Sequence, residues 1–270
     1  MTTIAVLGAG NMAGAIARRL AATGPQTTVR LTTRTRVPAW AAELDNVEHR
    51  ALESDPTATA WALAGADVVL VGVKPVGVVD LLQEIAPLIA PGAVVVSVAA
   101  GVRLAPMRAA LPAHARLVRT MPNTPVAVGR GVTAVAIEDD APAEVLADAV
   151  ALLEPTGLVE PLPESSIDAF SAVCGSGPAY AYYVVEALRD ASARLGLPAE
   201  LAERAVPAML AGSLAYLEQS GEEPAELRRQ VTSPGGSTAQ AIGVFDDRDL
   251  KGLIADGLEA ARLRNVEMGA

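Results

Sequence analysis

Several residue types that commonly build functional sites are scarce in this sequence. Its 270 residues include one cysteine (Cys174), two histidines (His49 and His114) and two lysines (Lys74 and Lys251). A single cysteine cannot form an internal disulfide, which fits a reducing compartment, so we expect a cytoplasmic protein. The two histidines are far apart in the chain and lack partner ligands at metal-binding spacing, so we expect no metal site.

Long apolar runs and a positive net charge are also missing. The longest apolar stretch, around residues 88–102, is interrupted by proline and glycine, so no membrane span is predicted. The net charge is −10, which repels phosphate backbones and anionic lipids. These observations argue against nucleic acids and membranes as partners and favour a small molecule. A bound anion would need backbone N–H groups or a few well-placed basic side chains.

Short apolar runs alternate with helical patterns in the first part of the chain. Strands are predicted at Thr3–Leu7, Val29–Thr32, Val68–Val73, Val94–Ala99, Arg116–Thr120, Thr133–Ala136 and Leu158–Glu160. Helices are predicted at Met12–Ala22, Ala39–Glu43, Pro56–Ala64, Val76–Ile89, Ala105–Leu111 and Ala141–Leu153. Alternating strands and helices predict a parallel sheet covered on both faces, and right-handed crossovers make it a doubly wound α/β domain.

The pattern changes after Pro163, where the strand signals stop. Ser165 followed by Asp168 resembles a capping box at the start of this second part. Helices are predicted at Ala179–Leu195, Pro198–Ser220, Pro224–Gln230, Ser237–Phe245 and Asp247–Met268. We therefore predict a Rossmann-like domain at residues 1–163, followed by an all-helical domain at residues 164–270.

A glycine-rich turn follows the first predicted strand and precedes the first predicted helix. Its sequence, Gly8-Ala9-Gly10-Asn11-Met12-Ala13-Gly14, matches the G-x-G-x-x-G/A arrangement of dinucleotide-binding folds. Gly8 allows a tight turn, Gly10 lets the backbone approach a pyrophosphate, and the helix N-terminus supplies N–H donors. The position between a strand and a helix favours a cofactor site over an ordinary glycine turn.

The end of the second strand indicates which dinucleotide binds. NAD-preferring sites usually place an acid there to hold the ribose 2′-hydroxyl, whereas this chain reads Thr33-Arg34-Thr35-Arg36. Hydroxyl and guanidinium groups suit a 2′-phosphate, so we predict NADPH in preference to NADH. The alternative is a solvated basic turn without a ligand.

Three later segments follow strand ends, where ligands bind in such sheets. Lys74 and Pro75 come after Val68–Val73, and the lysine is long enough to reach a cofactor phosphate or ribose. The other two segments contain Ala100 and Asn123 and are small, or rigid and polar, as the lining of a crevice should be. Lys74 can equally be an exposed lysine on a loop.

The helical part contains one unusual loop, Val231-Thr232-Ser233-Pro234-Gly235-Gly236-Ser237-Thr238. Backbone N–H groups at the start of the helix that follows can hold a carboxylate without a lysine or arginine. The hydroxyl of Thr238 can hydrogen-bond a substrate nitrogen or relay a proton. The alternative is a capped turn between two helices. Cys174, in contrast, has no histidine nearby in the sequence and is interpreted as a small buried residue rather than a nucleophile.

Together these segments resemble the pyrroline-5-carboxylate reductase family. The segments that carry the resemblance are Gly8–Ile16, Val73–Pro75, Ser97–Val102, Met121–Pro125, Gly175–Tyr180 and Val231–Phe245. The resemblance covers nearly the whole chain and implies a Rossmann domain followed by a helical dimerisation domain. It also implies reduction of 1-pyrroline-5-carboxylate to L-proline with NADPH or NADH, in homodimers that often assemble into decamers.

The resemblance further implies roles for individual residues. The substrate carboxylate and ring nitrogen are expected to contact Ser233, Gly235, Gly236, Ser237 and Thr238, with Thr238 assisting protonation. Thr59 stands where an asparagine often contacts the cofactor ribose. The expected cofactor-binding residues are therefore Gly8, Gly10, Asn11, Met12, Thr33, Arg34, Thr59, Lys74, Pro75, Ala100 and Asn123. Cys174 and Ser237 replace the family's usual serine and threonine, which concerns affinity rather than reaction class.

Three other functions compete with this interpretation. A β-hydroxyacid dehydrogenase would place a catalytic lysine on a helix of the second domain, but the helix after Gly177 has none and Lys251 lies outside any such motif. A reductase of another cyclic imine, with a six-membered ring for example, would share the same motifs. A non-catalytic NADP-binding sensor would not need the intact loop that ends at Thr238.

Overall fold

The computed structural model describes residues 2–24 and 26–269 of the chain. The chain forms two compact units, one made of Met1–Pro178 with Ala261–Ala270 and the other of Ala179–Ala260. The last turns of the C-terminal helix thus pack with the first unit, where Asn265 Nδ2 donates a hydrogen bond of 3.1 Å to the carbonyl of Asp168.

The first unit is built on one eight-stranded sheet with the strand order β3-β2-β1-β4-β5-β6-β7-β8. The strands are β1 (Thr2–Leu7), β2 (Thr27–Thr33), β3 (Val47–Ala51), β4 (Val68–Val71), β5 (Val94–Ser97), β6 (Arg116–Met121), β7 (Gly131–Ala136) and β8 (Gly157–Pro161). The chain leaves β1 in one direction to form β2 and β3, and returns to the other side of β1 to form β4. The strand order therefore reverses between β1 and β4, which is where doubly wound sheets open a crevice for ligands.

Two strands, β7 and β8, run against the other six, which corrects the expectation of a parallel sheet. β7 pairs with β6 antiparallel, with Arg119 opposite Ala136, while every other neighbouring pair in the described sheet is parallel. The chain between these strands contains a single short 3₁₀ helix, η4 (Thr124–Val128). A parallel crossover needs a dozen or more residues, so this connection is too short for one and the chain turns back.

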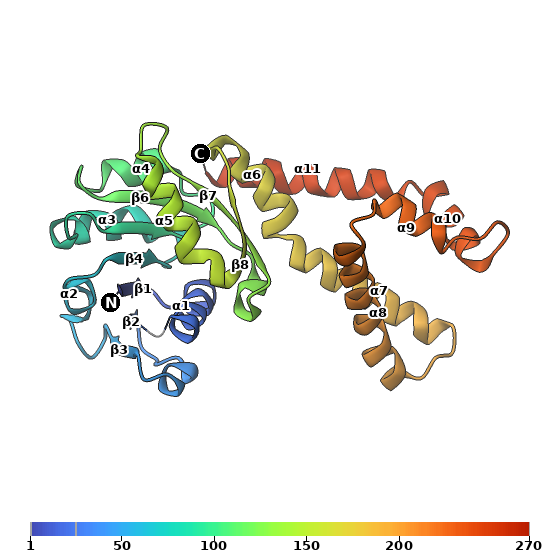
Figure 1. Cartoon of the computed structure of the whole chain (residues 1–270), viewed down its shortest axis with the longest axis horizontal. Helices are drawn as coiled ribbons and strands as arrows, with labels where there is room; N and C mark the ends of the chain where they lie inside the picture. Colours follow the sequence, from blue (N-terminus) through green and yellow to red (C-terminus); the bar gives the residue numbers. More distant parts are fainter. Residues whose placement is uncertain (1, 25, 270) are drawn as a thin grey trace. The chain divides into compact units, whose positions relative to one another are not determined.

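Helices cover both faces of the sheet (Figure 1). The first unit contains α1 (Asn11–Thr23), α2 (Ala58–Leu63), α3 (Val78–Ile85), α4 (Leu104–Ala109), α5 (Ala143–Leu153) and α6 (Ile167–Phe170). Short 3₁₀ helices lie at η1 (Ala39–Glu43), η2 (Pro75–Gly77), η3 (Ala86–Leu88), η5 (Glu154–Thr156) and η6 (Glu164–Ser166), and a π-helix, η7, at Ser171–Gly175.

Successive residues of each central strand feed two separate apolar cores. On β1, Ala5 and Leu7 pack with α2, α3 and α4, whereas Ile4 and Val6 pack with α1 and α5. Side chains alternate between the two faces of a strand, so a strand buried on both faces is a continuous apolar run. This is why the apolar runs of the sequence located the central strands correctly.

The expected capping box at Ser165 and Asp168 is wrong. The helical segment begins with η6 at Glu164, and neither cap position, Pro163 or Ser166, has a capping side-chain hydrogen bond. The carboxylates of Glu164 and Asp168 instead pair with Arg119 on β6. Glu164 Oε1 accepts hydrogen bonds from the backbone N–H of Leu104 (2.7 Å) and from the buried guanidinium of Arg119 (2.8 Å).

The remaining elements are all helical, as predicted. They are α7 (Gly177–Arg194), α8 (Ala199–Ser220), α9 (Pro224–Gln230), α10 (Ser237–Asp247) and α11 (Leu250–Met268). The expected helix from Asp247 starts three residues later, because Asp249 has a φ of +50° and ends the preceding helix. Its carboxylate then accepts a hydrogen bond of 3.2 Å from Gly252 N and caps α11. Among the described helices, none combines the length and apolarity that a membrane crossing requires.

Candidate functional site

The glycine turn lies at the carboxyl end of β1, beside the point where the strand order reverses. Gly8 has a φ of +82°, which L-residues with a side chain rarely adopt. The N–H groups of Gly8 and Ala9 donate to the carbonyl of Thr32 at 3.2 and 3.0 Å. A Cβ on Gly8 would lie 2.9 Å from Val73 Cγ1 and 3.1 Å from its backbone nitrogen. Only glycine fits this turn, as the motif predicts.

A second glycine, on the other side of the crevice, lets α1 approach the sheet. A Cβ on Gly72, just after β4, would lie 2.2 Å from the Cβ of Ala13 and 2.6 Å from the carbonyl oxygen of Gly8. The N-cap of α1 is Gly10, which offers no side-chain cap, and the first turn has no acidic residue. The first N–H groups of α1 are therefore available to an anion.

A cavity of about 400 Å³ opens beside this turn. Gly10 and Asn11 line it together with Arg18, Arg36 and Trp40. The uncapped helix start, the glycine backbone and the two guanidinium groups match what a dinucleotide phosphate requires, so these residues fit such a cofactor. Our expected cofactor residues included Gly10 and Asn11 but not Arg18 or Trp40, which enter the cavity only through folding.

At the end of β2, the hydroxyl of Thr33 is engaged within the protein rather than free for a ligand. Thr33 Oγ1 donates to the carbonyl of Arg36 (2.9 Å) and lies 2.7 Å from His49 Nε2. A hydroxyl has one proton, so His49 Nε2 must be the donor in the second bond. Burial lowers the pKa of His49 below its ordinary value. Thr33 thus already has partners for its proton and for one lone pair.

An acid is present at this edge although none follows β2 in the chain. Glu53, just beyond β3, places Oε1 3.4 Å from Arg34 Nε. The segment directly after β2 contains no acid, as the sequence shows, but the fold brings Glu53 to it from the neighbouring strand end. β3 was not predicted, because its sequence Val47-Glu48-His49-Arg50-Ala51 has little apolar character.

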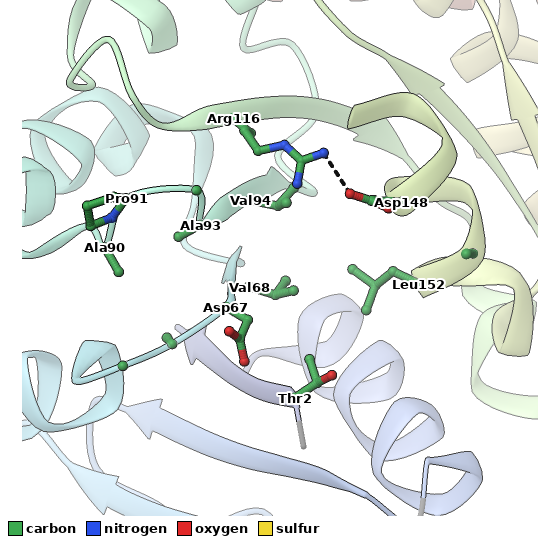
Figure 2. A pocket seen from close by; sticks show the side chains of 14 residues that line it. Thr2, Asp67, Val68, Ala90, Pro91, Ala93, Val94, Arg116, Asp148 and Leu152 are labelled. Atoms are coloured by element: carbon green, nitrogen blue, oxygen red, sulfur yellow. Dashed lines mark hydrogen bonds and ion pairs between the residues drawn. The ribbon is translucent and has the colours of Figure 1, made fainter. Parts of the chain in front are cut away.

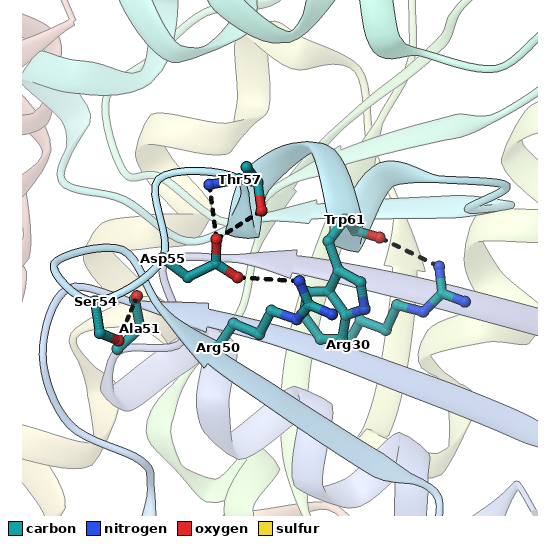
Figure 3. A network of polar contacts seen from close by, with 7 residues as sticks. All are labelled: Arg30, Arg50, Ala51, Ser54, Asp55, Thr57 and Trp61. Carbon is teal, nitrogen blue, oxygen red and sulfur yellow. Dashed lines mark hydrogen bonds and ion pairs between the residues drawn. The ribbon is translucent and has the colours of Figure 1, made fainter.

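A polar network lies around the start of α2, the helix that contains Thr59 (Figure 3). Asp55 Oδ1 accepts hydrogen bonds from Thr57 Oγ1 (2.6 Å) and Thr57 N (2.9 Å), and Asp55 Oδ2 accepts one from Arg50 (3.0 Å). The bonds from Thr57, followed by that from Arg50, lower the pKa of the Asp55 carboxyl. The Arg50 guanidinium also lies 4.4 Å from the centre of the Trp61 ring. This network ties the helix that carries Thr59 to the neighbouring strand.

The other expected cofactor residues follow the carboxyl ends of central strands. Lys74 and Pro75 come after β4 and are exposed, and the half-buried Ala100 comes after β5. Asn123, after β6, is buried, and its side chain bonds to the protein: Nδ2 donates to the carbonyl of Cys174 (3.0 Å), and Oδ1 accepts from Val132 N (2.8 Å). Asn123 thus fixes the strand end to the π-helix. Burial raises the pKa of the Cys174 thiol, which fits a non-nucleophilic cysteine.

The expected substrate loop lies in the second unit and forms a turn followed by a helix. Gly236 N donates to the carbonyl of Ser233 (3.0 Å), and Gly235 has a φ of +69°, the pattern of a turn with Pro-Gly at its centre. Gly236 is the N-cap of α10 without a side-chain cap, and the first turn has no acid. Ser237 and Thr238 are exposed. The loop thus presents hydroxyls and free N–H groups, as a carboxylate site would.

Two family models match different parts of this chain. Residues 164–268 match the family model described as pyrroline-5-carboxylate reductase dimerisation, and residues 3–101 match the one described as NADP oxidoreductase, coenzyme F420-dependent. A pyrroline-5-carboxylate reductase from Corynebacterium melassecola is 36% identical, over 100% of this chain and 99% of its own. The chain belongs to the pyrroline-5-carboxylate reductase family.

Solved structures of this family have the same fold. A pyrroline-5-carboxylate reductase from Coxiella burnetii is 30% identical with a TM-score of 0.86, covering 100% of this chain and 99% of that one. The Plasmodium falciparum pyrroline carboxylate reductase, solved with NADP bound, has the same TM-score at 22% identity and covers 100% of this chain and 98% of its own. The second likeness concerns the fold alone.

A larger cavity in this family member lies away from the expected site. It has a volume of about 760 Å³ and opens at the amino ends of the strands, beside Thr2, Val68 and Val94 (Figure 2). Arg116 and Asp148 form an ion pair of 2.6 Å on its wall. Ligands of doubly wound sheets bind at the carboxyl ends, so the size of this cavity does not make it the cofactor site.

Proposed function

We propose that this chain catalyses the reduction of 1-pyrroline-5-carboxylate to L-proline with NADPH, and that it also accepts NADH. The observation that carries the proposal is the 36% identity to a pyrroline-5-carboxylate reductase over the full length of both chains. The two candidate sites agree with it, because one suits a dinucleotide phosphate and the other a small carboxylate.

The cofactor is proposed to bind along the carboxyl edge of the sheet. Its pyrophosphate would contact Gly8, Gly10, Asn11 and Met12, where the glycine turn allows close approach and the uncapped helix supplies N–H donors. Its adenine ribose would face Thr33 and Arg34, and the rest of the molecule Thr59, Lys74, Pro75, Ala100 and Asn123. When bound, the cofactor supplies the hydride, so the protein contributes binding and orientation.

The substrate is proposed to bind the loop before α10. Its carboxylate would lie against Gly236 and accept hydrogen bonds from the backbone N–H groups of Gly235 and Ser237 and from the hydroxyls of Ser233 and Ser237. The Thr238 hydroxyl would hydrogen-bond the ring nitrogen and help to hold its proton. A protonated imine is a good electrophile, so positioning and electrostatics suffice without a strong acid or base.

The absence of a lysine on α7 supports reduction of a C=N bond, as does the loop before α10. α7 carries Tyr180, Tyr182 and Tyr183 but no lysine, and Lys251 lies on α11. A 3-hydroxy acid dehydrogenase would need a catalytic lysine on such a helix, so we favour reduction of a C=N bond over oxidation of an alcohol.

We also propose that the chain works in the cytoplasm as a homodimer joined through its helical part, with further assembly into decamers. The functional domains would be residues 1–163 for NADP and residues 164–270 for substrate and dimerisation. Many large apolar side chains of the helical part are exposed in a single copy: Tyr182, Tyr183, Val184, Leu195, Leu214, Tyr216, Phe245, Leu253 and Ile254. A second copy of the chain would cover such a surface.

The test measures oxidation of NADPH with pyrroline-5-carboxylate and with a piperideine carboxylate. In the opposite direction, it measures reduction of NADP with a 3-hydroxy acid. We expect the highest kcat/KM with pyrroline-5-carboxylate. Thr238→Ala should lower that value by a factor on the order of 10 to 100 if its hydroxyl acts in the transition state. Ser213→Ala is the control, because this exposed hydroxyl donates a hydrogen bond within its own helix, to the carbonyl of Met209. Faster turnover of the hydroxy acid, or no activity at all, would overturn the proposal.

A further inference from the structure

The carboxyl ends of β2 and β3 continue to pair beyond the last residue of each strand. Leu52 N donates to the carbonyl of Thr33 (2.9 Å), and Glu53 N donates to the carbonyl of Arg34 (3.1 Å). This backbone pairing fixes Glu53 beside Arg34 independently of their side chains. The carboxylate therefore occupies the sheet edge where an acid at the end of β2 would read the cofactor ribose.

The two side chains at this edge are exposed and only weakly held. Arg34 Nε and Glu53 Oε1 are 3.4 Å apart, and the side chains are 88% and 59% exposed. An exposed ion pair of this kind contributes little to stability, so either group can turn to a ligand at small cost. Thr33 is less free, because it already contacts Arg36 and His49.

We propose that Glu53 is a specificity-determining residue, which weakens binding of a 2′-phosphorylated dinucleotide and strengthens binding of one with a free ribose 2′-hydroxyl. This inference rests on the proposed cofactor site. A 2′-phosphate pairs with Arg34 but is repelled by the neighbouring carboxylate, whereas a 2′-hydroxyl donates a hydrogen bond to that carboxylate. Arg34 and Glu53 together thus let one site use both cofactors.

The experiment measures binding of 2′,5′-ADP and 5′-AMP to the full chain by calorimetry, since the two probes differ only at the 2′ position. We expect Glu53→Gln to tighten 2′,5′-ADP by about three- to tenfold, the effect of removing one solvent-screened charge near a phosphate. We expect the same variant to weaken 5′-AMP, because its 2′-hydroxyl then loses a charged hydrogen-bond acceptor. Arg34→Gln should weaken 2′,5′-ADP alone.

Glu48→Gln is the matched control. Glu48 lies on β3, the strand that Glu53 follows, and is also exposed and paired with an arginine, Arg30, at 3.7 Å. It changes the net charge equally but should leave the ratio of the two affinities as in the wild type. The inference is overturned if Glu53→Gln leaves that ratio unchanged, if Glu48→Gln shifts it equally, or if the wild type binds neither probe.

The outcome is separable from the proposed reaction. A chain that reduces pyrroline-5-carboxylate but shows no shift in the affinity ratio refutes the role of Glu53 alone. A chain that shows the shift but does not reduce the imine refutes the proposed substrate and supports Glu53.

Discussion

The close packing of Gly72, just after β4, against Ala13 of α1 provides a sharp test of the glycine turn as a cofactor site. In Gly72→Ala, the new methyl carbon would lie 2.2 Å from the Cβ of Ala13 and 2.6 Å from the carbonyl oxygen of Gly8. Carbon atoms in contact prefer about 3.5–4.0 Å, so α1 and β4 must separate by about 1.3 Å. Both obstacles are fixed to the backbone, and no side-chain rotation relieves the clash.

This separation should affect stability and function together. Overpacking of this kind costs about 1–3 kcal/mol, and we expect the upper part of that range here because the obstacles are rigid. The Gly8 turn would move with α1, and misplacement by about 1 Å can lower kcat/KM by a factor on the order of 100.

Urea unfolding followed by tryptophan fluorescence measures the first effect, because Trp40 and Trp61, the two tryptophans of the chain, both lie in the first unit. NADPH-dependent turnover measures the second. Gly14→Ala is the stability control, since its Cβ would meet its nearest atom, the carbonyl oxygen of Ala9, at an ordinary 3.4 Å. Wild-type stability and turnover in Gly72→Ala would refute the packing argument.

Two further predictions concern the helical unit and His49. Loss of helical circular dichroism on heating should shift to higher temperature when the protein concentration is raised, because a unit stabilised by a second copy gains stability by mass action; a midpoint independent of concentration would contradict dimerisation through this unit. Burial lowers the folded-state pKa of His49 below its ordinary value of 6.5. As the pH is lowered through 6.5, the unfolded chain therefore binds a proton at this histidine before the folded chain does. The free energy of unfolding decreases as the pH is lowered, until the folded-state pKa is passed. His49→Gln should therefore lose less free energy of unfolding than the wild type between about pH 7.5 and 5, as measured by urea titration; equal losses would rule out His49 as a source.

The sequence predicted the parts of the fold that are buried on both faces. The predicted strands Thr3–Leu7, Val68–Val73 and Val94–Ala99 agree with β1, β4 and β5 to within two residues at each end, because a strand between two helical layers has no polar face. The edge strand β3 could not be found in this way. Four of its five residues are partly buried and Glu48 is exposed, and pairing with β2 rather than an apolar pattern makes it a strand.

The same limit explains what was missed at the candidate site. The glycine turn was predictable because Gly8 and Gly10 are local requirements of one short segment. Glu53 and His49 reach the end of β2 only through pairing with β3, so neither has a local signal there. Gly72 belongs to none of the motifs identified in the sequence. Because Gly72 has no side chain, it leaves room for the Cβ of Ala13 at the third position of the glycine turn. Residues that act across strands need the topology before they can be recognised.

The helical unit, residues 179–260, buries too few side chains to be stable without a partner. Of residues 179–260, all of which the structure describes, only Ser192, Ala202 and Val206 are buried. Three small side chains cannot offset the conformational entropy lost in ordering helices of this length. The apolar surface that remains exposed is the kind that a homodimer interface buries. The loop before α10 is part of this unit, so the geometry of the proposed substrate site should depend on dimerisation, and activity should be lost together with the dimer.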